Sequence, residues 1–205
     1  FVVEPYSAGY IGIMEWIASS LQSLYPGSRI VVRPDERIAV KEGADFSKVA
    51  KAYPSPDFIE ISENLLRMKV NLKTGHKTGF FLDQRENRLT LSQYCHGKEV
   101  LDCFCYTGGF AISAMLAGAK SASAIDLDEK ALETARENAR HNSANVTFQH
   151  VNAFDHLRMM IRKGMQADIV ILDPAKLAGC TEEISRAHRT YGDINKLGMQ
   201  VVSPG

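Results

Sequence analysis

A single stretch, Glu99 to Asp128, constrains the fold more than any other part of the sequence. It holds a short apolar run ending in Asp102, a turn containing Gly108 and Gly109, a run of helix-forming residues, and a second apolar run ending in Asp126. Strand, glycine turn, helix, strand and acid is the order found in a nucleotide-binding βαβ unit. The stretch therefore predicts an α/β fold built on a parallel sheet.

The spacing within this unit narrows the choice of ligand. Gly108 and Asp126 are 18 positions apart, close to the roughly 20 expected between a phosphate-binding turn and an acid that bonds ribose hydroxyls. The turn lacks the three spaced glycines of a dinucleotide site. Together with Asp102, this favours a nucleoside with a cationic amino-acid tail, a description that S-adenosylmethionine (SAM) fits. The alternative is a generic βαβ unit with incidental glycines.

Composition limits the class of protein. Of 205 residues, 45% are hydrophobic, enough for one large domain or two small ones. The formal net charge is zero, so RNA binding would need a local basic patch. The four cysteines lack metal-binding spacing, and no metal site is expected. Without a membrane-length apolar run or a signal-peptide pattern, we expect a cytoplasmic protein with no membrane partner.

Two domains are predicted. Residues 1–72 are predicted to form a small α+β domain. It would begin with a strand and a helix that ends at Pro26-Gly27. Further strands are predicted over 29–33, 37–41, 58–61 and 65–72, and a loop over 42–57. Residues 73–205 begin with a helix over 85–94. They then alternate strands at 100–102, 122–126, 146–151 and 168–172 with helices at 110–119, 129–142, 155–163 and 181–202, the last with Ile184, Ala187, Tyr191, Ile194 and Val201 on its apolar face. This alternation implies a mostly parallel sheet.

Each predicted strand of the second domain ends near a polar residue; these residues are Asp102, Asp126, Asn152 and Asp173. Because the carboxyl ends of parallel strands line one crevice, we expect the four side chains around one ligand. Asp126 would accept from ribose hydroxyls and Asn152 would bond the adenine amino group. Asp102 would lie near the amino-acid tail, and Asp173 would face both the sulfonium and the substrate. Taken singly, each is equally a turn residue or a helix cap.

The segment after the last of these strands carries further candidates. Pro174 forces an extended conformation on Asp173 and so holds it at the strand tip. Lys176 is a candidate to meet a phosphate or a base carbonyl, with a solvated surface lysine as the alternative.

Cations also gather between residues 65 and 88. Of these, Lys73, Lys77 and Arg88 are candidates to hold RNA phosphates, with a solvated connection between domains as the alternative.

Several segments resemble one family, the class I methyltransferases that make 5-methylcytosine in large-subunit ribosomal RNA. They are Gly75–Arg88, Leu101–Ala111, Ala124–Leu132, Asn152–Phe154, Asp168–Lys176 and Tyr191–Asn195. The resemblance implies a Rossmann-like class I methyltransferase sheet preceded by the small α+β domain, with large-subunit rRNA as partner; a homodimer stays open. In that family an RNA-binding PUA domain comes first and the catalytic cysteine follows a later strand. The chain is therefore expected to be an internal fragment with a C-terminally truncated sheet.

The resemblance also implies site residues. From it, SAM contacts are expected at Gln84, Arg85, Phe104, Cys105, Tyr106, Thr107, Gly108, Asp126, Asn152 and Asp173. Besides these, we expect SAM contacts at Asp102, Leu127 and Ala153 and catalytic roles at Asp173 and Lys176. The chain departs from the family at Ala175, where a second proline is usual, which would loosen the substrate-facing loop.

The cysteines bear on the reaction, because cytosine C5 is a poor nucleophile until a thiolate adds at C6. Cys103 and Cys105 are expected to be buried and Cys95 to end a helix, which leaves Cys180, on a loop, as the remaining stand-in. Three other functions therefore stay open. They are guanine N7 methylation, which needs no covalent activation, a non-catalytic RNA-binding assembly factor, and a small-molecule methyltransferase.

Overall fold

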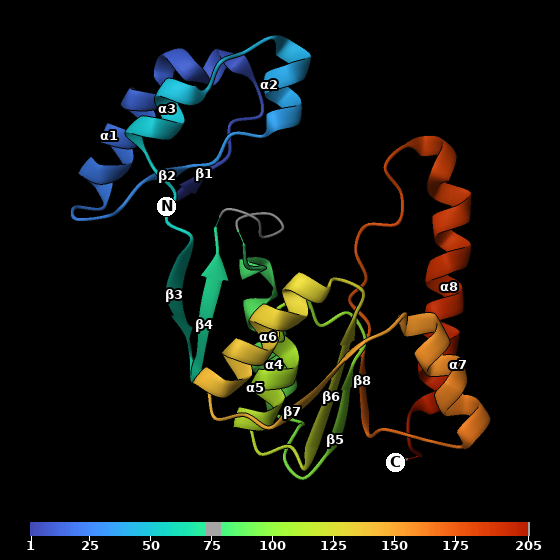
Figure 1. The fold of residues 1–205 in the computed structure, drawn as a ribbon. Coiled ribbons are helices and arrows are strands. Elements are labelled where there is room, and N and C mark those ends of the chain that lie inside the picture. The colour runs from blue at the N-terminus through green and yellow to red at the C-terminus, as the bar shows by residue number, and fades with distance from the viewer. Residues whose placement is uncertain (73–78, 205) are drawn as a thin grey trace. The chain divides into compact units, whose positions relative to one another are not determined.

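The computed structural model describes residues 1–72 and 79–204 (Figure 1). Contacts divide the chain into two compact units, Phe1–Ile59 with Val70–Phe81, and Glu60–Lys69 with Leu82–Gly205. This division differs from the boundary expected between residues 72 and 73, because the tip of a β-hairpin packs within the second unit. Each unit has a core of its own.

The first unit is built around a short parallel pair of strands. Val2 and Val3 pair with Val31 and Val32. The elements in order are β1 (Val2–Val3), the 3-10 helix η1 (Ala8–Ile13), α1 (Met14–Leu24), β2 (Val31–Val32), α2 (Glu36–Glu42) and α3 (Ser47–Ala52). Met14 from α1 and Val49 from α3 are buried with Val32 in one cluster.

Two sequence predictions in this unit are wrong. Residues 37–41, predicted as a strand, lie in α2. The Asp35 side chain caps this helix by accepting from Arg37 N, and the helix ends at Gly43 in the left-handed conformation. Residues 47–52, predicted as part of a loop, form α3, which buries Val49. Capping in α2 and burial of Val49 in α3 outweigh the intrinsic preferences of these short segments.

The strands predicted over 58–61 and 65–72 are confirmed, and they form a β-hairpin. Strands β3 (Phe58–Glu63) and β4 (Leu66–Asn71) form a two-stranded sheet. Asn64 turns the chain with a φ of 54°. Leu66, Met68 and Val70 are buried, which is the period-two pattern of a strand with one face on a core.

The second unit is a Rossmann-like α/β fold, which confirms the predicted fold class. Its four strands lie in the order β7-β6-β5-β8 and every neighbouring pair is parallel. The elements are η2 (Leu82–Gln84), α4 (Arg85–Ser92), β5 (Glu99–Asp102), α5 (Gly109–Leu116), β6 (Ser121–Asp126), α6 (Glu129–His141), β7 (Val146–His150), α7 (Ala153–Lys163), β8 (Ile169–Ile171), η3 (Thr181–Glu183) and α8 (Ile184–Val201).

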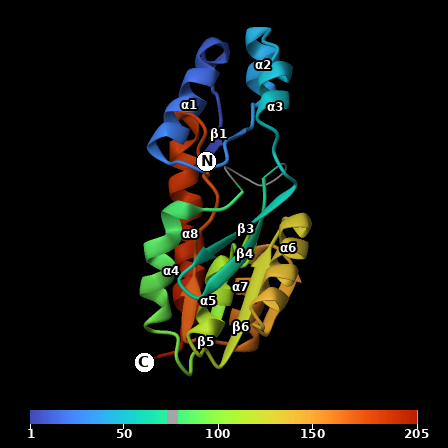
Figure 2. The same cartoon turned by 90° about the vertical axis from the view of Figure 1, so that its left-hand side faces the viewer.

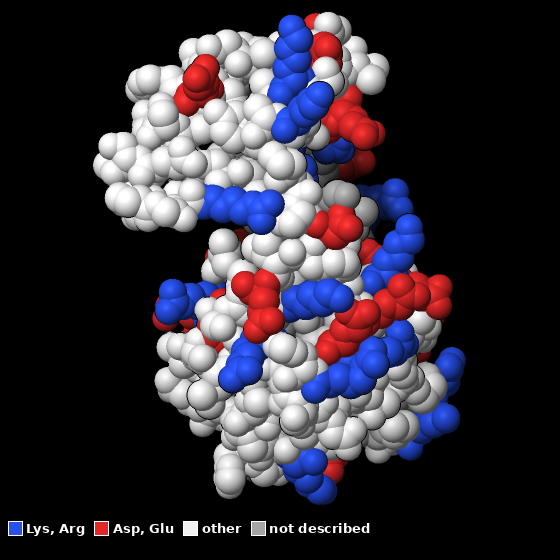
Figure 3. Space-filling model, turned by 60° about the vertical axis from the view of Figure 1, so that its left-hand side comes forward, with Lys and Arg blue, Asp and Glu red and all other residues white. Residues whose placement is uncertain are grey.

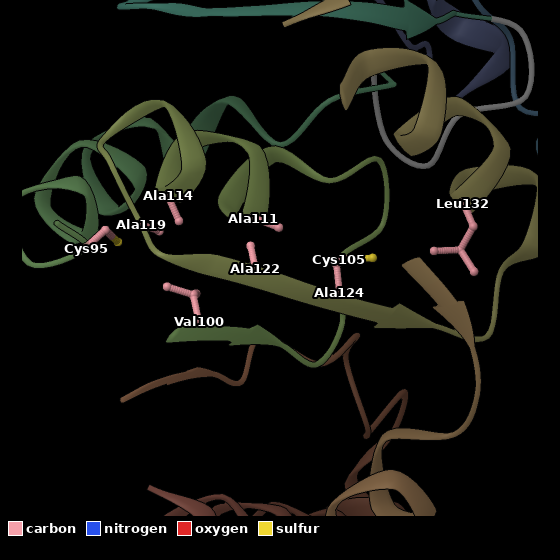
Figure 4. Close-up of a cluster of buried hydrophobic side chains, with 9 residues drawn as sticks. All are labelled: Cys95, Val100, Cys105, Ala111, Ala114, Ala119, Ala122, Ala124 and Leu132. Carbon is pink, nitrogen blue, oxygen red and sulfur yellow. The ribbon is translucent and has the colours of Figure 1, made fainter. Parts of the chain in front are cut away.

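Helices cover both faces of this sheet (Figures 1 and 2). Val100 and Ala124 point into a cluster with α5 and Leu132 of α6, where alanines let the helix approach the strands closely (Figure 4). The next residues along each strand, Leu101 and Ile125, point to the other face and pack on α7 and α8. The alternation places one core on each side of the sheet.

The long last helix is confirmed, but its expected apolar face is partly wrong. Ile184 and Tyr191 are 52% and 37% exposed, whereas Ala187, Ile194 and Val201 are buried as expected. Gly198 is also buried. A Cβ at this position would lie 2.7 Å from Leu172 Cδ1, so a larger residue here would require the Leu172 side chain to shift.

A buried ion pair joins the hairpin tip to α4. Arg88 Nε and Nη2 donate to the Glu63 carboxylate at 2.7 and 2.6 Å, and the Phe110 ring lies 5.9 Å from the guanidinium carbon. Arg88 is 3% exposed, so the hypothesis that it holds an RNA phosphate is wrong. Lys73 and Lys77 lie outside the described residues.

Replacing Arg88 with Met should lower the free energy of unfolding by about 3–5 kcal/mol, because the Glu63 carboxylate would stay buried without its partner. Urea denaturation followed by circular dichroism measures this. The control is Lys120→Ala, which removes the exposed Lys120–Glu99 pair and should cost about 1 kcal/mol or less. Equal losses in the two variants would contradict the assignment.

Candidate cofactor site

Hydrogen bonds hold the turn after β5 in one conformation. Gly108 N donates to Cys105 O at 2.7 Å, and Cys105 N donates to Ile125 O of β6 at 3.1 Å. Tyr106 and Gly108 have φ values of 48° and 85°. A Cβ on Gly108 would lie 3.1 Å from Ile112 Cδ1. Glycine therefore serves this position both by its backbone conformation and by its small size.

The Asp126 carboxylate ties this turn to the end of β6. One of its oxygens accepts from Tyr106 N at 2.8 Å and the other from Asp128 N at 2.9 Å. The side chain is only half-buried, and each carboxylate oxygen has a second lone pair available to a ligand hydroxyl. This geometry suits the predicted ribose contact.

Strand register aligns the acids. Asp102, at the end of the central strand β5, lies opposite Ala124 of β6 and Ile171 of β8. Asp126 and Asp173 each follow two residues after those partners. The two acids therefore flank Asp102 from neighbouring strands at the carboxyl edge of the sheet, where strand order reverses between β5 and β8.

Asp102 is the most unusual group of the site. It is 1% exposed, and neither carboxylate oxygen has a hydrogen-bond partner among the residues that the structure describes. Burial raises its pKa to about 7; the charges of Asp126 and Asp173 raise it further, and the nearby amides of Phe104 and Ala111 act in the opposite direction. A buried, unpaired carboxylate fits a ligand that brings a cation or donors.

Asp173 is oriented by side chains from the start of α4. Gln84 Nε2 donates to Asp173 Oδ2 at 3.0 Å, and Gln84 Oε1 accepts from Asn87 Nδ2 at 2.6 Å. Gln84, expected to contact the cofactor, therefore bonds a site carboxylate. Its direct contact with a cofactor stays a prediction.

Asn152 acts as a helix cap. Its Oδ1 accepts from Phe154 N at 2.9 Å and from Asp155 N at 3.3 Å, which starts α7. Helix capping was the alternative role for a polar residue at a strand end. The Asn152 side chain caps the helix with its Oδ1 atom. The adenine contact of Asn152 stays a prediction, as does any contact of the buried Ala153.

The remaining candidates differ in exposure. Thr107 is buried and Phe104 half-buried within the turn, whereas the side chains of Arg85, Leu127 and Lys176 are exposed. The thiols of Cys103 and Cys105 are buried as expected. Burial raises the pKa of both, that of Cys103 to about 12, so they stay protonated near neutral pH. Cys180 is exposed.

Sequence reasoning missed Asn138, a residue of α6 that is fully buried. Its Nδ2 donates to the carbonyl of Thr107 in the turn at 3.3 Å. The signal was present, because Asn138 occupies an inward position beside Ala135 and Ala139 on the apolar face of the helix. A polar residue there must find a buried partner.

The structure also bears on metal binding and membrane spanning. In residues 1–72 and 79–204, no cluster of three or more His, Cys, Asp or Glu side chains is arranged to bind a metal ion. No helix in the same part of the chain has the length and apolar character needed to cross a membrane.

Comparison with known families settles which family the chain joins. A family model described as S-adenosylmethionine-dependent methyltransferase matches residues 50–198. The chain belongs to this family. SAM is therefore the cofactor of this chain.

Similar sequences agree. The chain is 39% identical over 208 residues to Ribosomal RNA large subunit methyltransferase I of Aeromonas salmonicida. It is 40% identical over 207 residues to the protein of that name from Pseudoalteromonas atlantica. Both matches cover 100% of this chain and 52% of the relative, so the chain spans about half the length of these relatives.

Solved structures share the methyltransferase fold. One is a protein assigned as a methyltransferase and solved in complex with S-adenosylhomocysteine (SAH). It superposes on this chain with a TM-score of 0.78 at 23% identity, and the match covers 99% of this chain and 52% of that one. A SAM-dependent methyltransferase from Agrobacterium tumefaciens gives a TM-score of 0.64 at 21% identity, covering 73% and 50%. At these identities the likeness supports the fold.

The residues of the methyltransferase site fit SAM. The cofactor carries a sulfonium and an ammonium group, and three carboxylates lie at the carboxyl ends of adjacent strands. The unpaired Asp102 carboxylate can accept from the ammonium group, and Asp126 can accept from ribose hydroxyls. A group of this charge would therefore relieve the electrostatic cost of the site.

The pKa of Asp102 predicts a pH-dependent stability. Because its folded-state pKa of about 7 exceeds the roughly 3.9 of an unfolded chain, the folded state holds the proton longer, and stability falls as pH rises between these values. Asp102→Asn removes this loss. Its stability gain over the parent should be roughly 2–3 kcal/mol larger at pH 8 than at pH 5, since each pKa unit corresponds to 1.36 kcal/mol.

Urea denaturation at both pH values measures this difference. Asp193→Asn, at an exposed position on α8, is the matched control and should show no such change. A gain that is the same at pH 5 and pH 8 would mean that Asp102 titrates as an ordinary aspartate.

Proposed function

We propose that this chain is the SAM-binding part of a methyltransferase that acts on large-subunit ribosomal RNA, with C5 of a cytosine as its target. The observation that carries the cofactor role is the buried, unpaired Asp102 between two other strand-end carboxylates in a chain of the SAM-dependent family. The rRNA substrate is supported by relatives with that name that match along the whole chain. The cytosine target is supported by the resemblance of its motifs.

Different residues of the site contact different parts of the cofactor. When bound, SAM supplies a methyl group made electrophilic by its sulfonium. Asp126 accepts from the ribose hydroxyls and, through Tyr106 N, keeps the turn in its binding conformation. Asp102 pairs with the amino-acid end, and its low-dielectric surroundings strengthen this pairing.

Asp173 serves the substrate side. Gln84 orients its carboxylate, and Pro174 keeps the backbone extended at the strand tip. A target base has to leave its stack to reach this edge of the sheet, as in other enzymes that modify bases. Lys176, exposed shortly after Asp173, is placed to contact the RNA backbone or the base.

RNA binding would depend on local contacts. On the face shown in Figure 3, Lys and Arg alternate with Asp and Glu and form no single basic field. This agrees with the net charge of zero. Specific hydrogen bonds and stacking with unpaired bases therefore fit this surface better than non-specific attraction to phosphates.

A second candidate is methylation of guanine N7. Cys95, Cys103 and Cys105 are buried and burial raises the pKa of each thiol, so none of the three supplies the thiolate that cytosine C5 requires. Guanine N7 carries an accessible lone pair and needs no covalent activation. The state of these thiols is the observation that favours this alternative.

Replacing Asp126 with Ala should weaken SAH binding by roughly ten- to a hundredfold. The variant loses charge-assisted hydrogen bonds worth about 1.5–3 kcal/mol and releases the turn at Tyr106. Isothermal titration calorimetry measures the affinity, with Glu133→Ala on the exposed side of α6 as control. Unchanged affinity would place the ribose elsewhere, and a parent chain that binds NAD in place of SAH would overturn the cofactor assignment.

The methylated product distinguishes the two candidates. We expect 5-methylcytidine when large-subunit rRNA is incubated with methyl-labelled SAM and the methyltransferase of which this chain is the proposed SAM-binding part, then digested to nucleosides and separated by chromatography. Label in 7-methylguanosine would establish the second candidate instead. SAH binding without any labelled nucleoside would count against rRNA methylation.

A further inference from the structure

Two asparagines on α6 hold the edge of the hairpin. Asn142 accepts from Arg67 N at 2.9 Å and donates to Arg67 O at 2.6 Å. One turn earlier, Asn138 accepts from Lys69 N at 2.8 Å and donates to Lys69 O at 3.4 Å. Each side-chain amide therefore occupies the place that a peptide group of a neighbouring strand would take.

The spacing of the two elements makes this possible. Four residues of a helix rise about 6 Å, and two residues of a strand rise about 6.6 Å. Amides at positions 138 and 142 therefore meet alternate residues of β4 with little strain. The exposed Lys69–Glu137 ion pair, at 2.8 Å, adds little to this docking.

Asn138 and Asn142 differ in the partner of their third hydrogen bond, which for Asn142 is the Asn138 carbonyl at 2.8 Å. The amide nitrogen of Asn138 donates instead to Thr107 O in the cofactor turn at 3.3 Å, next to Tyr106, whose N–H bonds Asp126. An amide NH₂ has two hydrogens, one for the hairpin and one for the turn. Asn138 is fully buried, so a loss of either partner would leave a polar group without water to replace it.

We propose that Asn138 is a positioning residue that couples the cofactor turn to the docking of the β3–β4 hairpin. The inference rests on the proposed binding of SAM in that turn. Ligand contacts that fix the turn also fix the Thr107 carbonyl, and this carbonyl orients the amide that holds Lys69. Coupling of this kind is reciprocal. Cofactor binding therefore stabilises the docked position of the hairpin, and docking of the hairpin raises the affinity for the cofactor.

The matched variants Asn138→Ala and Asn142→Ala test this proposal. Both remove one amide clamp from β4, but only the first removes the contact with Thr107. In Asn138→Ala we expect SAH affinity, measured by calorimetry, to fall by about 5- to 20-fold, within the usual range of coupling between sites. In Asn142→Ala the affinity should stay within about twofold, because that side chain bonds the hairpin and the Asn138 carbonyl but has no hydrogen bond to the turn.

Amide hydrogen exchange, followed by NMR, supplies a readout that a purely structural role would not change. In the parent chain, saturating SAH should slow exchange of the Lys69 amide by about fivefold or more. Asn142→Ala should expose the Arg67 amide and keep the effect of SAH on Lys69. Asn138→Ala should abolish that effect.

Each other outcome is informative. Equal SAH affinities in the two variants, or a Lys69 amide that ignores SAH in the parent chain, would overturn the coupling while leaving the proposed function intact. A parent chain that binds no SAH would overturn both. Should Asn138→Ala fail to fold, exchange of the Lys69 amide in the parent chain with and without SAH still tests the coupling, because that measurement needs no variant.

Discussion

The parallel pairing of β5 with both of its neighbours is the constraint on which the rest of the structure depends. Because Asp102 lies opposite Ala124 and Ile171, the acids two residues further along β6 and β8 flank it at the same edge. A shift of one residue would turn these side chains to the opposite face of the sheet. The apolar residues that alternate with them, packed against helices on both faces, hold this register.

Gathering acids at this edge has an energetic cost. Asp102 is buried, without a hydrogen-bond partner among the described residues, and its pKa rises because burial and the neighbouring carboxylates both oppose ionisation. A positively charged ligand such as SAM, which we propose binds here, would offset this cost, and perturbed pKa values of this kind are common at functional sites. The buried ion pair of Arg88 with Glu63 shows the opposite arrangement, in which the partner is built into the chain.

Helix α6 links features that are distant in the sequence. The Asp128 side chain starts it by accepting from Ala131 N, directly after the β6 acid that holds the turn. Ala135 lies against Gly108 of that turn, and Asn138 bonds both the turn and the hairpin. Helix α6 therefore contacts both the turn after β5 and the β3–β4 hairpin. The coupling that we propose between the turn and the hairpin would pass through this helix.

Local pattern was sufficient for the α/β unit. The alternating strands and helices, the paired glycines of the turn and the acids at the strand ends could all be predicted from the sequence. These features were predictable because each one depends only on residues a few positions away in the sequence. The same reasoning failed for residues 37–41 and 47–52, where short segments carry weak preferences and burial of Val49 in a distant cluster decides the outcome.

The sequence by itself determined the fold class of the second unit, the edge at which its acids meet and the family to which its motifs point. Only the tertiary structure decided that Arg88 is buried against Glu63, that Gln84 bonds Asp173 and that Asn138 joins the turn to the hairpin. Each of these contacts spans between 25 and 89 residues of chain. No periodicity within one element can specify such a partner, because its position depends on how separate elements pack.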